Sequence, residues 1–465
     1  MLAMPSMLED IRTASRGYKI SVVEGAITVL GSSLISPMST PLLLRLGADA
    51  NVLGLYTALV SVSTPPFQLA AALLLDKFRE KRVLIMCTFA AASRAMWLGV
   101  LFAILGFGGG MWEVVLYLWL SNVLGVFAGL AWTDLMADLV EPERRGRLFA
   151  LRNTVHGLIN IAGLLAAKLL YDRLGYPYGY VLGIEIGAFL MLVAVPLLYL
   201  YGDPYRPKGV GLGVRGALAV LRRRDILRDS AALSLWSLSV NIVGGIWNYH
   251  MYTVFGADES WFTSLNLVGG IVGTLANPPW GTFYDRYGPR ATFLISGLGI
   301  VAVPAFFPFL PSLAGQASLQ TYSTILWTGF NLASFNYAVS YTGEYRHVYI
   351  AVYNIIPSLA SAVGVLLGVQ LYNVIGVIAF FTSSVGRFIA LLLLYKISSS
   401  RGATYEELKV SSHLYPLYMA GKQMVAVTYV EFVYALRLFY AAVLTVTLLA
   451  MLAALYAVLL NLVKV

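Results

Sequence analysis

The chain has few charged residues and almost no cysteine. Asp, Glu, Lys and Arg together make up 12% of its 465 residues, whereas a soluble domain carries about 25%. Hydrophobic residues make up 59% and the mean hydropathy is +0.75, so too few polar side chains are present to cover a water-facing surface. The composition therefore predicts a polytopic membrane protein. The single cysteine, Cys87, excludes an intrachain disulfide and a cysteine metal cluster.

The sequence also lacks catalytic motifs and a signal peptide. The sequence contains no Walker phosphate loop and no HExxH motif, which disfavours an enzyme, and we expect neither a cofactor nor a metal site. Residues 1–19 lack the apolar core and cleavage site of a signal peptide, so the first apolar segment is expected to be retained. The cations behind the net charge of +9 lie in short turns beside apolar runs. This placement favours anionic lipid headgroups over nucleic acid as the partner.

Twelve apolar segments are long enough to cross a bilayer, which takes about 20 residues each, and they predict an all-α fold. Alternate loops, such as residues 77–82 and 144–152, are rich in Lys and Arg, whereas the opposite loops hold Arg45, Arg173 and little else. This asymmetry predicts that the protein spans the cell membrane with its N-terminus on the cytoplasmic side. The segments are 20–44, 52–75, 83–106, 112–136, 148–171, 178–201, 230–254, 261–284, 291–310, 317–340, 348–373 and 376–397.

The segments fall into two equal groups. Residues 202–229 form a basic linker, expected to be cytoplasmic, between an N-terminal six-helix bundle (1–201) and a C-terminal one (230–400). Residues 401–465 begin as a polar tail and end with an apolar run, 438–463. That run is long enough for a thirteenth helix, which would place the C-terminus outside; the alternative is a helix packed beside the bundles without crossing. We expect a monomer.

The two groups are related by an internal repeat. Residues 145–175 and 346–376 align without a gap at a spacing of 201. Chance similarity between apolar segments is the alternative, but chance does not readily align Glu, Arg and Asn as well. One six-helix unit therefore occurs twice in the same orientation, as in secondary transporters. The matches include Arg145 with Arg346, Asn153 with Asn354 and Gly163 with Gly364, and just upstream Glu143 matches Glu344.

A charged turn follows the second segment of each group. The second copy, residues 281–290, resembles the signature G-x-L-A-D-R-x-G-R-K of the major facilitator superfamily, whereas the first copy, residues 72–82, has Ala72 and Arg79 in place of glycines. The resemblance covers about residues 18–400. It implies two six-helix bundles related by a pseudo-two-fold axis that rock around a site at the membrane midplane. The matching residues are Asp76, Lys77 and Lys81 in the first copy and Gly281, Asp285, Arg286, Gly288 and Arg290 in the second.

Two marks of the family's drug/proton antiporters are missing. Residues 120–125 of the fourth segment contain no arginine, and residues 157–170 of the fifth contain no proline. A drug exporter of that type is therefore disfavoured, although efflux of organic compounds by the same fold stays open as an alternative.

The resemblance implies a conformational gate at the cytoplasmic ends of the helices. Asp76 would bind the start of the helix near residue 348, and Asp285 the start of the helix near 148, because a helix N-terminus attracts a carboxylate. The alternative is that these loops only fix the topology through their positive charge. The candidate gate residues are Asp76, Lys77, Lys81, Asp138, Glu143, Arg145, Asp285, Arg286, Gly288, Arg290, Glu344 and Arg346.

A few charges fall within the apolar segments, where charge is costly and marks a functional hypothesis. Glu24 lies in a stripe with Thr28 and Ser32 at helical spacing and is our candidate for proton coupling. The alternative is that it pairs with a loop arginine near the cytoplasmic interface. Arg94 and Arg387 lie on helices that are peripheral in the family, so no substrate role is predicted for them.

Amide and indole side chains within the segments are candidates for binding a small-molecule substrate. Amides and aromatic rings with few central charges suit a neutral, hydroxylated or amphipathic solute. For any single Asn, hydrogen bonding between helices is the alternative. The candidates are Asn122, Asn153, Asn160, Trp236, Asn241, Asn248, Trp327 and Asn331.

These observations favour a secondary active transporter that works by alternating access, with Glu24 as the candidate residue if transport is coupled to protons; a sodium ion or no coupling ion stays open. Two other classes stay open. A membrane-embedded enzyme would need a catalytic motif that the sequence does not show. A non-transporting sensor or scaffold would use the C-terminal run to bind its partner and would produce no flux.

Overall fold

The structure is a computed structural model in which every regular element of the described residues is a helix. Residues 204–223 of the predicted linker, the predicted thirteenth helix and the gate residues Glu143 and Glu344 lie outside the part of the chain that it describes, whereas the end of the predicted linker forms the start of a helix at Arg224. It describes residues 14–106, 110–139, 145–203, 224–339 and 346–397.

The twelve predicted segments all correspond to described helices. In the N-terminal bundle the first segment is divided into three elements and the sixth into two. Its elements are α2 (Arg16–Ile35), η1 (Ser36–Met38), α3 (Ser39–Arg45), α4 (Ala50–Lys77), η2 (Arg79–Lys81), α5 (Arg82–Ile104), α6 (Met111–Leu139), α7 (Arg145–Leu174), α8 (Tyr178–Val193) and α9 (Val195–Tyr199).

In the C-terminal bundle the seventh segment is divided into two helices, and the eighth and ninth join in one long element. Within that element Gly288 has φ 75°, a left-handed conformation that favours glycine, so the charged turn is a sharp kink. The elements are α11 (Arg224–Asn241), α12 (Trp247–Thr253), α13 (Glu259–Phe306), η3 (Phe307–Phe309), α14 (Leu313–Val339), α15 (Arg346–Ile375) and α16 (Ile378–Ile397).

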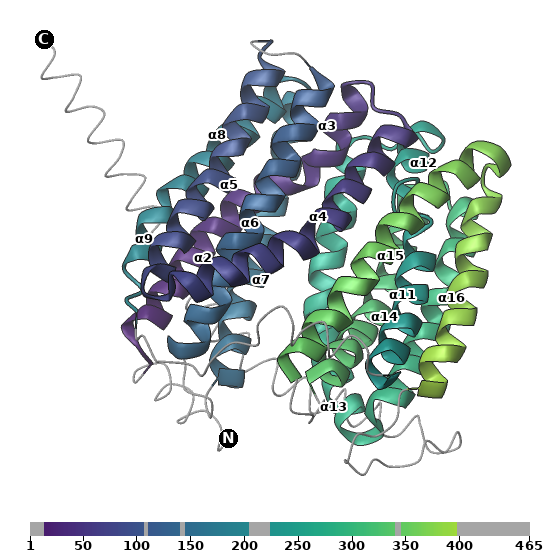
Figure 1. Cartoon of the computed structure of the whole chain (residues 1–465). Coiled ribbons are helices and arrows are strands. Elements are labelled where there is room, and N and C mark those ends of the chain that lie inside the picture. The colour runs from purple at the N-terminus through teal and green to yellow at the C-terminus, as the bar shows by residue number, and fades with distance from the viewer. Residues whose placement is uncertain (1–13, 107–109, 140–144, 204–223, 340–345, 398–465) are drawn as a thin grey trace, which may run out of the picture.

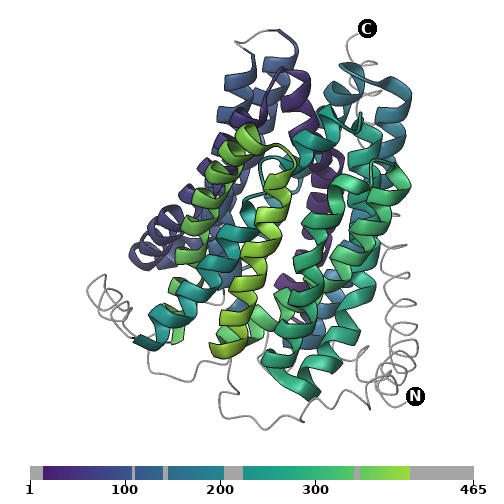
Figure 2. The ribbon, with the colours of Figure 1, turned by 90° about the vertical axis from the view of Figure 1, so that its right-hand side faces the viewer.

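The two bundles stand side by side in Figure 1, and in Figure 2 the C-terminal bundle lies in front of the N-terminal one. Across the junction α4 packs against α15 and α7 packs against α13. These are the second and eleventh, and the fifth and eighth, predicted segments, so the two contacts are equivalent under the sequence repeat. Among the described residues, eight helical stretches are long and apolar enough to cross a membrane. The chain is therefore an all-α polytopic membrane protein.

Aspartates in short polar loops cap the N-termini of two helices. Asp49 precedes α4, and its Oδ1 accepts from the backbone N–H of Val52 at 2.9 Å, while its Oδ2 accepts from Asn51 at 3.0 Å. These hydrogen bonds hold the pKa of Asp49 below its usual range, since they favour the charged form. Asp258 caps α13 in the same way, accepting from the N–H of Trp261 at 3.0 Å. Both caps fix where a transmembrane helix begins.

Glycines allow α15 to lie directly against α11. A Cβ placed on Gly364 would stand 2.3 Å from the carbonyl oxygen of Leu238, and one on Gly368 would stand 1.7 Å from that of Ile242. No side chain fits at these distances, so this small-x-x-x-small pair is a close-packing face. This contact holds α11, the first part of the interrupted seventh segment, against α15.

Candidate transport cavity

The first helix of each bundle is interrupted near its middle. In the N-terminal bundle η1 separates α2 from α3, with Pro37 at its start. In the C-terminal bundle residues 242–246 form turns between α11 and α12. Irregular backbone is tolerated in a membrane where it lines a cavity, and paired interruptions in two repeats point to a binding site. The two breaks define the middle of the candidate site.

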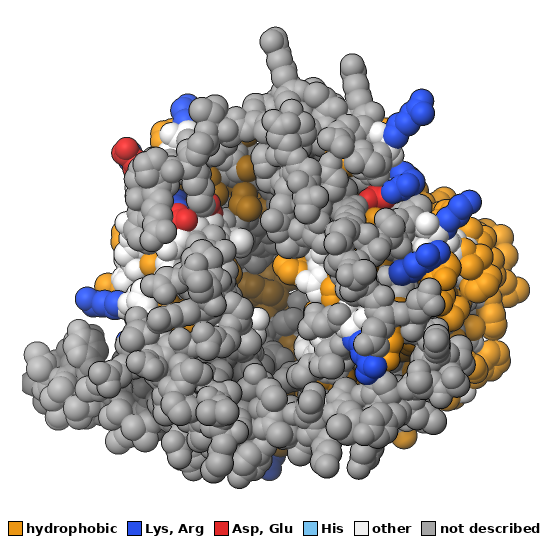
Figure 3. All heavy atoms as spheres, turned by 90° about the horizontal axis from the view of Figure 1, so that it is seen from below, with side chains coloured by type: hydrophobic (Ala, Val, Ile, Leu, Met, Phe, Trp, Pro, Cys, Tyr) orange, Lys and Arg blue, Asp and Glu red, His pale blue; other side chains and the backbone are white. Residues whose placement is uncertain are grey.

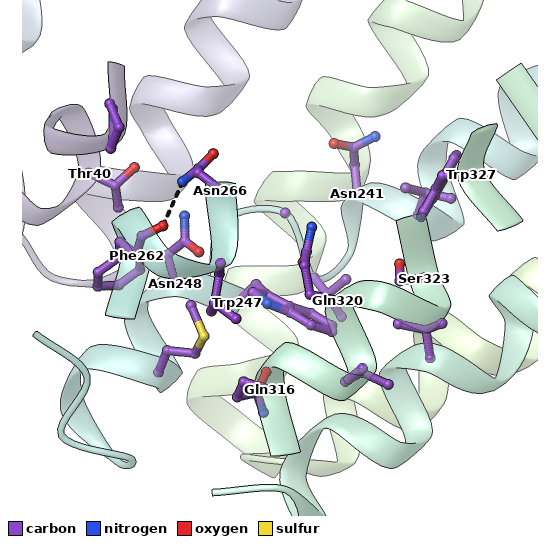
Figure 4. A pocket seen from close by; sticks show the side chains of 18 of the residues that line it. Thr40, Asn241, Trp247, Asn248, Phe262, Asn266, Gln316, Gln320, Ser323 and Trp327 are labelled. Atoms are coloured by element: carbon purple, nitrogen blue, oxygen red, sulfur yellow. Dashed lines mark hydrogen bonds between the residues drawn. The ribbon is translucent and has the colours of Figure 1, made fainter. Parts of the chain in front are cut away.

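A cavity of about 530 Å³ lies against both breaks. α13, α14 and Arg387 of α16 complete its wall, and Figure 4 shows amide and indole side chains around it. Its volume falls within the range of about 300–1,000 Å³ that is usual for small-molecule sites. The polar and aromatic lining residues are Ser36, Thr40, Asn241, Trp247, Asn248, Phe262, Asn266, Gln316, Gln320, Ser323, Trp327 and Arg387.

Two further cavities adjoin the first, since all three share Ser36 of η1. One of about 470 Å³ extends along α7 to Asn160, between the two bundles. The other, of about 550 Å³, extends into the N-terminal bundle to Asn122. Together they make a central, mostly uncharged polar space whose walls come from both bundles.

The predicted substrate residues divide between this space and the surrounding protein. Five of them line one of the three cavities, and three do not. Trp236 is 2% exposed and stacks on Phe330 with ring centroids 4.3 Å apart, within the apolar core. Asn153 and Asn331 are exposed and line none of the three cavities. The lining residues are Asn122, Asn160, Asn241, Asn248 and Trp327.

Several lining residues were not predicted. Gln316, Gln320 and Ser323 precede the predicted Trp327 along α14, at spacings of four, three and four. That helical periodicity is present in the sequence, and a search for glutamine as well as asparagine would find it. Asn266 of α13 donates to the carbonyl of Phe262 at 2.8 Å and lines two of the cavities.

One end of the junction between the bundles is closed by polar contacts. Arg45, at the end of α3, donates to Glu259, at the start of α13, at 2.7 and 3.3 Å. Tyr180 of α8 donates to the same carboxylate at 2.9 Å. Asn373 of α15 donates to Asn51 of α4 at 3.2 Å. We call this the closed end.

The opposite end carries the helix termini rich in Lys and Arg, and we call it the basic end. Figure 3 looks onto it and shows Lys and Arg side chains around a face that is hollowed near its centre. The bundles are therefore fastened together at the closed end, while the basic end is recessed.

The described gate residues lie at the basic end. Among them, Asp138 accepts from Arg82, which was not predicted as a gate residue. Arg82 is 1% exposed and donates to Asp134, Asp138 and Asp203 at 2.6–2.9 Å, all within the N-terminal bundle and the residues after it. Arg290 donates to the carbonyl of Tyr395 at 3.1 Å within the C-terminal bundle. Lys77, Lys81 and Arg286 are exposed and Gly288 forms the kink. The structure does not describe the side chains of Asp76, Arg145, Asp285 and Arg346.

Glu24 lies inside the N-terminal bundle, 3% exposed. Arg94 of α5 donates to its Oε1 at 2.9 Å, Thr28 donates to the same oxygen at 2.7 Å, and Tyr201 donates to Oε2 at 3.0 Å. Arg94 also donates to the carbonyl of Met191 at 2.6 Å. The partner of Glu24 is therefore a helix arginine. The pair does not line any of the three cavities.

The comparisons with known proteins agree with this architecture. The sequence profile of the Major Facilitator Superfamily matches residues 25–365, which is most of the chain, and the protein belongs to that family of transporters. None of the curated proteins compared with the chain matches it.

Solved structures of transporters share the fold at low sequence identity. A point mutant of the nucleoside transporter NupG has a TM-score of 0.63 at 12% identity, covering 82% of this chain and 99% of its own. A D-xylose-proton symporter has a TM-score of 0.61 at 14% identity, covering 84% and 98%. A bacterial homologue of the iron transporter ferroportin, solved in an inward-facing state, has a TM-score of 0.60 at 16% identity, covering 83% and 99%.

Proposed function

We propose that the protein is a secondary active transporter that moves a small hydroxylated or amphipathic solute across the cell membrane, as a monomer, by alternating access. The observation that supports this most directly is the central cavity at the two helix breaks. Its amides supply hydrogen bonds and its indoles supply apolar walls, which is the composition of a site for a small organic molecule. Because both bundles line the cavity, their relative motion changes which end is open.

The basic end faces the cytoplasm in this proposal, because membrane proteins concentrate Lys and Arg in cytoplasmic loops. The structure then corresponds to the inward-open state, with Arg45 and Glu259 closing the outer side. Asp76 and Asp285 would close the inner side in the opposite state by binding helix N-termini across the junction. Each state is then held by its own set of weak polar contacts.

Glu24 is the proposed coupling residue. Its pairing with Arg94 satisfies a carboxylate that would otherwise be costly at this depth. Protonation of Glu24 would break the pair and free Arg94, so the conformation of α2 would respond to the proton. α2 continues into η1, whose Ser36 and Pro37 line the cavity, which connects the coupling residue to the site through one helix.

Uptake into proteoliposomes tests the proposal. A panel of hydroxylated and amphipathic solutes is offered with and without an inward pH gradient. We expect gradient-driven accumulation of at least one solute, loss of accumulation in Glu24→Gln, and retention in the control Glu185→Gln, whose side chain is exposed on α8. Persistent accumulation in Glu24→Gln would refute the coupling. A complete lack of flux would favour the sensor or scaffold alternative.

A further inference from the structure

One charged side chain lines the central space. Arg387 of α16 reaches the wall of the 530 Å³ cavity between α11 and α13, and it is 3% exposed. Every other residue that lines this cavity or the two adjoining ones is uncharged. The space therefore has a formal charge of +1 within a region of low dielectric constant, where a single charge acts strongly.

The guanidinium is poorly satisfied by the protein. Nη1 donates to the carbonyl of Ile300 at 3.2 Å and Nη2 to that of Val240 at 3.4 Å, both longer than a charge-assisted hydrogen bond. Nε is buried and has no hydrogen-bond partner. Within the described ranges no carboxylate forms an ion pair with Arg387, in contrast to Arg82 and Arg94.

A buried cation without a counter-charge is unfavourable, and a bound anion relieves this cost. We propose that the cargo of this cavity carries one anionic group and that Arg387 is its charge partner. A carboxylate fits best, because it can accept two N–H bonds from one guanidinium and its single charge matches the single cation. This inference rests on the proposed function in that it takes the cavity as the cargo site. It narrows the solute from hydroxylated or amphipathic to monoanionic.

The position of Arg387 also excludes one class of cargo. A cationic solute placed in the same space would meet an uncompensated like charge at low dielectric. We therefore expect the order of affinity to be carboxylate, then the neutral amide, then the amine, for solutes of one shape.

The test is a binding measurement on the full-length protein in lipid nanodiscs. Trp247 and Trp327 line the cavity, so tryptophan fluorescence reports its occupancy. The probes are matched sets of one shape: benzoate, benzamide and benzylamine; nicotinate and nicotinamide; lactate and lactamide. In the wild type at least one carboxylate should bind about tenfold tighter than its amide, the scale of one charge-assisted contact.

Variants test whether Arg387 is the residue that causes the preference for a carboxylate over its amide. Arg387→Gln should lose it, Arg387→Lys should keep part of it, and Lys396→Gln, an exposed cation on the same helix, should leave it unchanged. Equal binding of carboxylate and amide by the wild type, no binding of any carboxylate, or a preference that survives Arg387→Gln would each overturn the inference. The wild-type comparison decides even if Arg387→Gln fails to fold. This binding assay measures no flux, so it is independent of the proteoliposome uptake assay. Uptake of a neutral solute in that assay would uphold the transporter proposal even if the present inference failed.

Discussion

The Nε of Arg45 lies 2.7 Å from Oε1 of Glu259, and this contact joins the last turn of the first transmembrane segment to the first turn of the eighth. The two residues are 214 positions apart and belong to different bundles. The side chain of Arg45 is 41% exposed and that of Glu259 is 13% exposed, so water screens the pair. The contact is suited to a closure that must open in each transport cycle.

Removing this pair should favour the state that opens at the closed end. In Arg45→Gln we expect the population of that state to rise by at most about fivefold, because an exposed ion pair contributes about 0–1 kcal/mol. The measurement is the labelling rate of a cysteine at Thr40, which lines the cavity, in a Cys87→Ala background. Arg173→Gln, an exposed cation at the same end, is the control. Labelling rates that are identical in Arg45→Gln and wild type would contradict the assignment.

The buried pair of Glu24 and Arg94 should affect stability differently from the exposed pair. Arg94→Gln leaves the carboxylate of Glu24 buried without its cation, which should lower the free energy of unfolding by about 3–5 kcal/mol. The double variant Glu24→Gln/Arg94→Gln should lose less, because no unpaired charge remains. The midpoint of thermal unfolding in detergent is measured for the wild type, Arg94→Gln and the double variant. A double variant as unstable as Arg94→Gln would show that the pair is not the reason for the loss.

Close packing of α15 on α11 gives a third prediction. In Gly368→Ala the added methyl group meets the carbonyl of Ile242, so the two helices must separate, at a cost of about 1–3 kcal/mol for overpacking. Gly129→Ala on α6 is the matched control, since a Cβ there has no neighbour within 4 Å. The midpoint of thermal unfolding should fall in the first variant only. Equal midpoints would mean that the helix contact is looser than described.

Much of this architecture could be predicted from the sequence. Length and hydropathy define transmembrane segments because the bilayer requires them, and the repeat and the charged turns indicate the family. The break in the first segment coincides with a proline, Pro37, which the sequence shows directly. The break at residues 242–246 contains no proline, and its glycine pair Gly244-Gly245 is an ambiguous signal, because the similar pair Gly269-Gly270 lies within the continuous helix α13.

The site could be predicted only in part. Asn241 and Asn248 lie near a helix break, and as amides within an apolar segment they are recognisable from the sequence. The pairing of Glu24 with Arg94 joins residues 70 positions apart, which no local pattern encodes. The sequence predicts no substrate role for Arg387, because the family resemblance places its helix at the periphery. Its contact with the cavity depends on how three helices meet, and only the tertiary structure shows that.

The central claim is that the space at the two helix breaks is where cargo binds. Uptake of the best panel solute into proteoliposomes, compared between two matched variants of α13, tests it most directly. Asn266 and Asn277 each donate to the carbonyl four residues earlier at 2.8 Å, but only Asn266 lines the cavities. We predict that Asn266→Ala reduces kcat/KM by about tenfold, the scale of one lost polar contact, and that Asn277→Ala equals the wild type. Equal uptake by both variants would contradict the account.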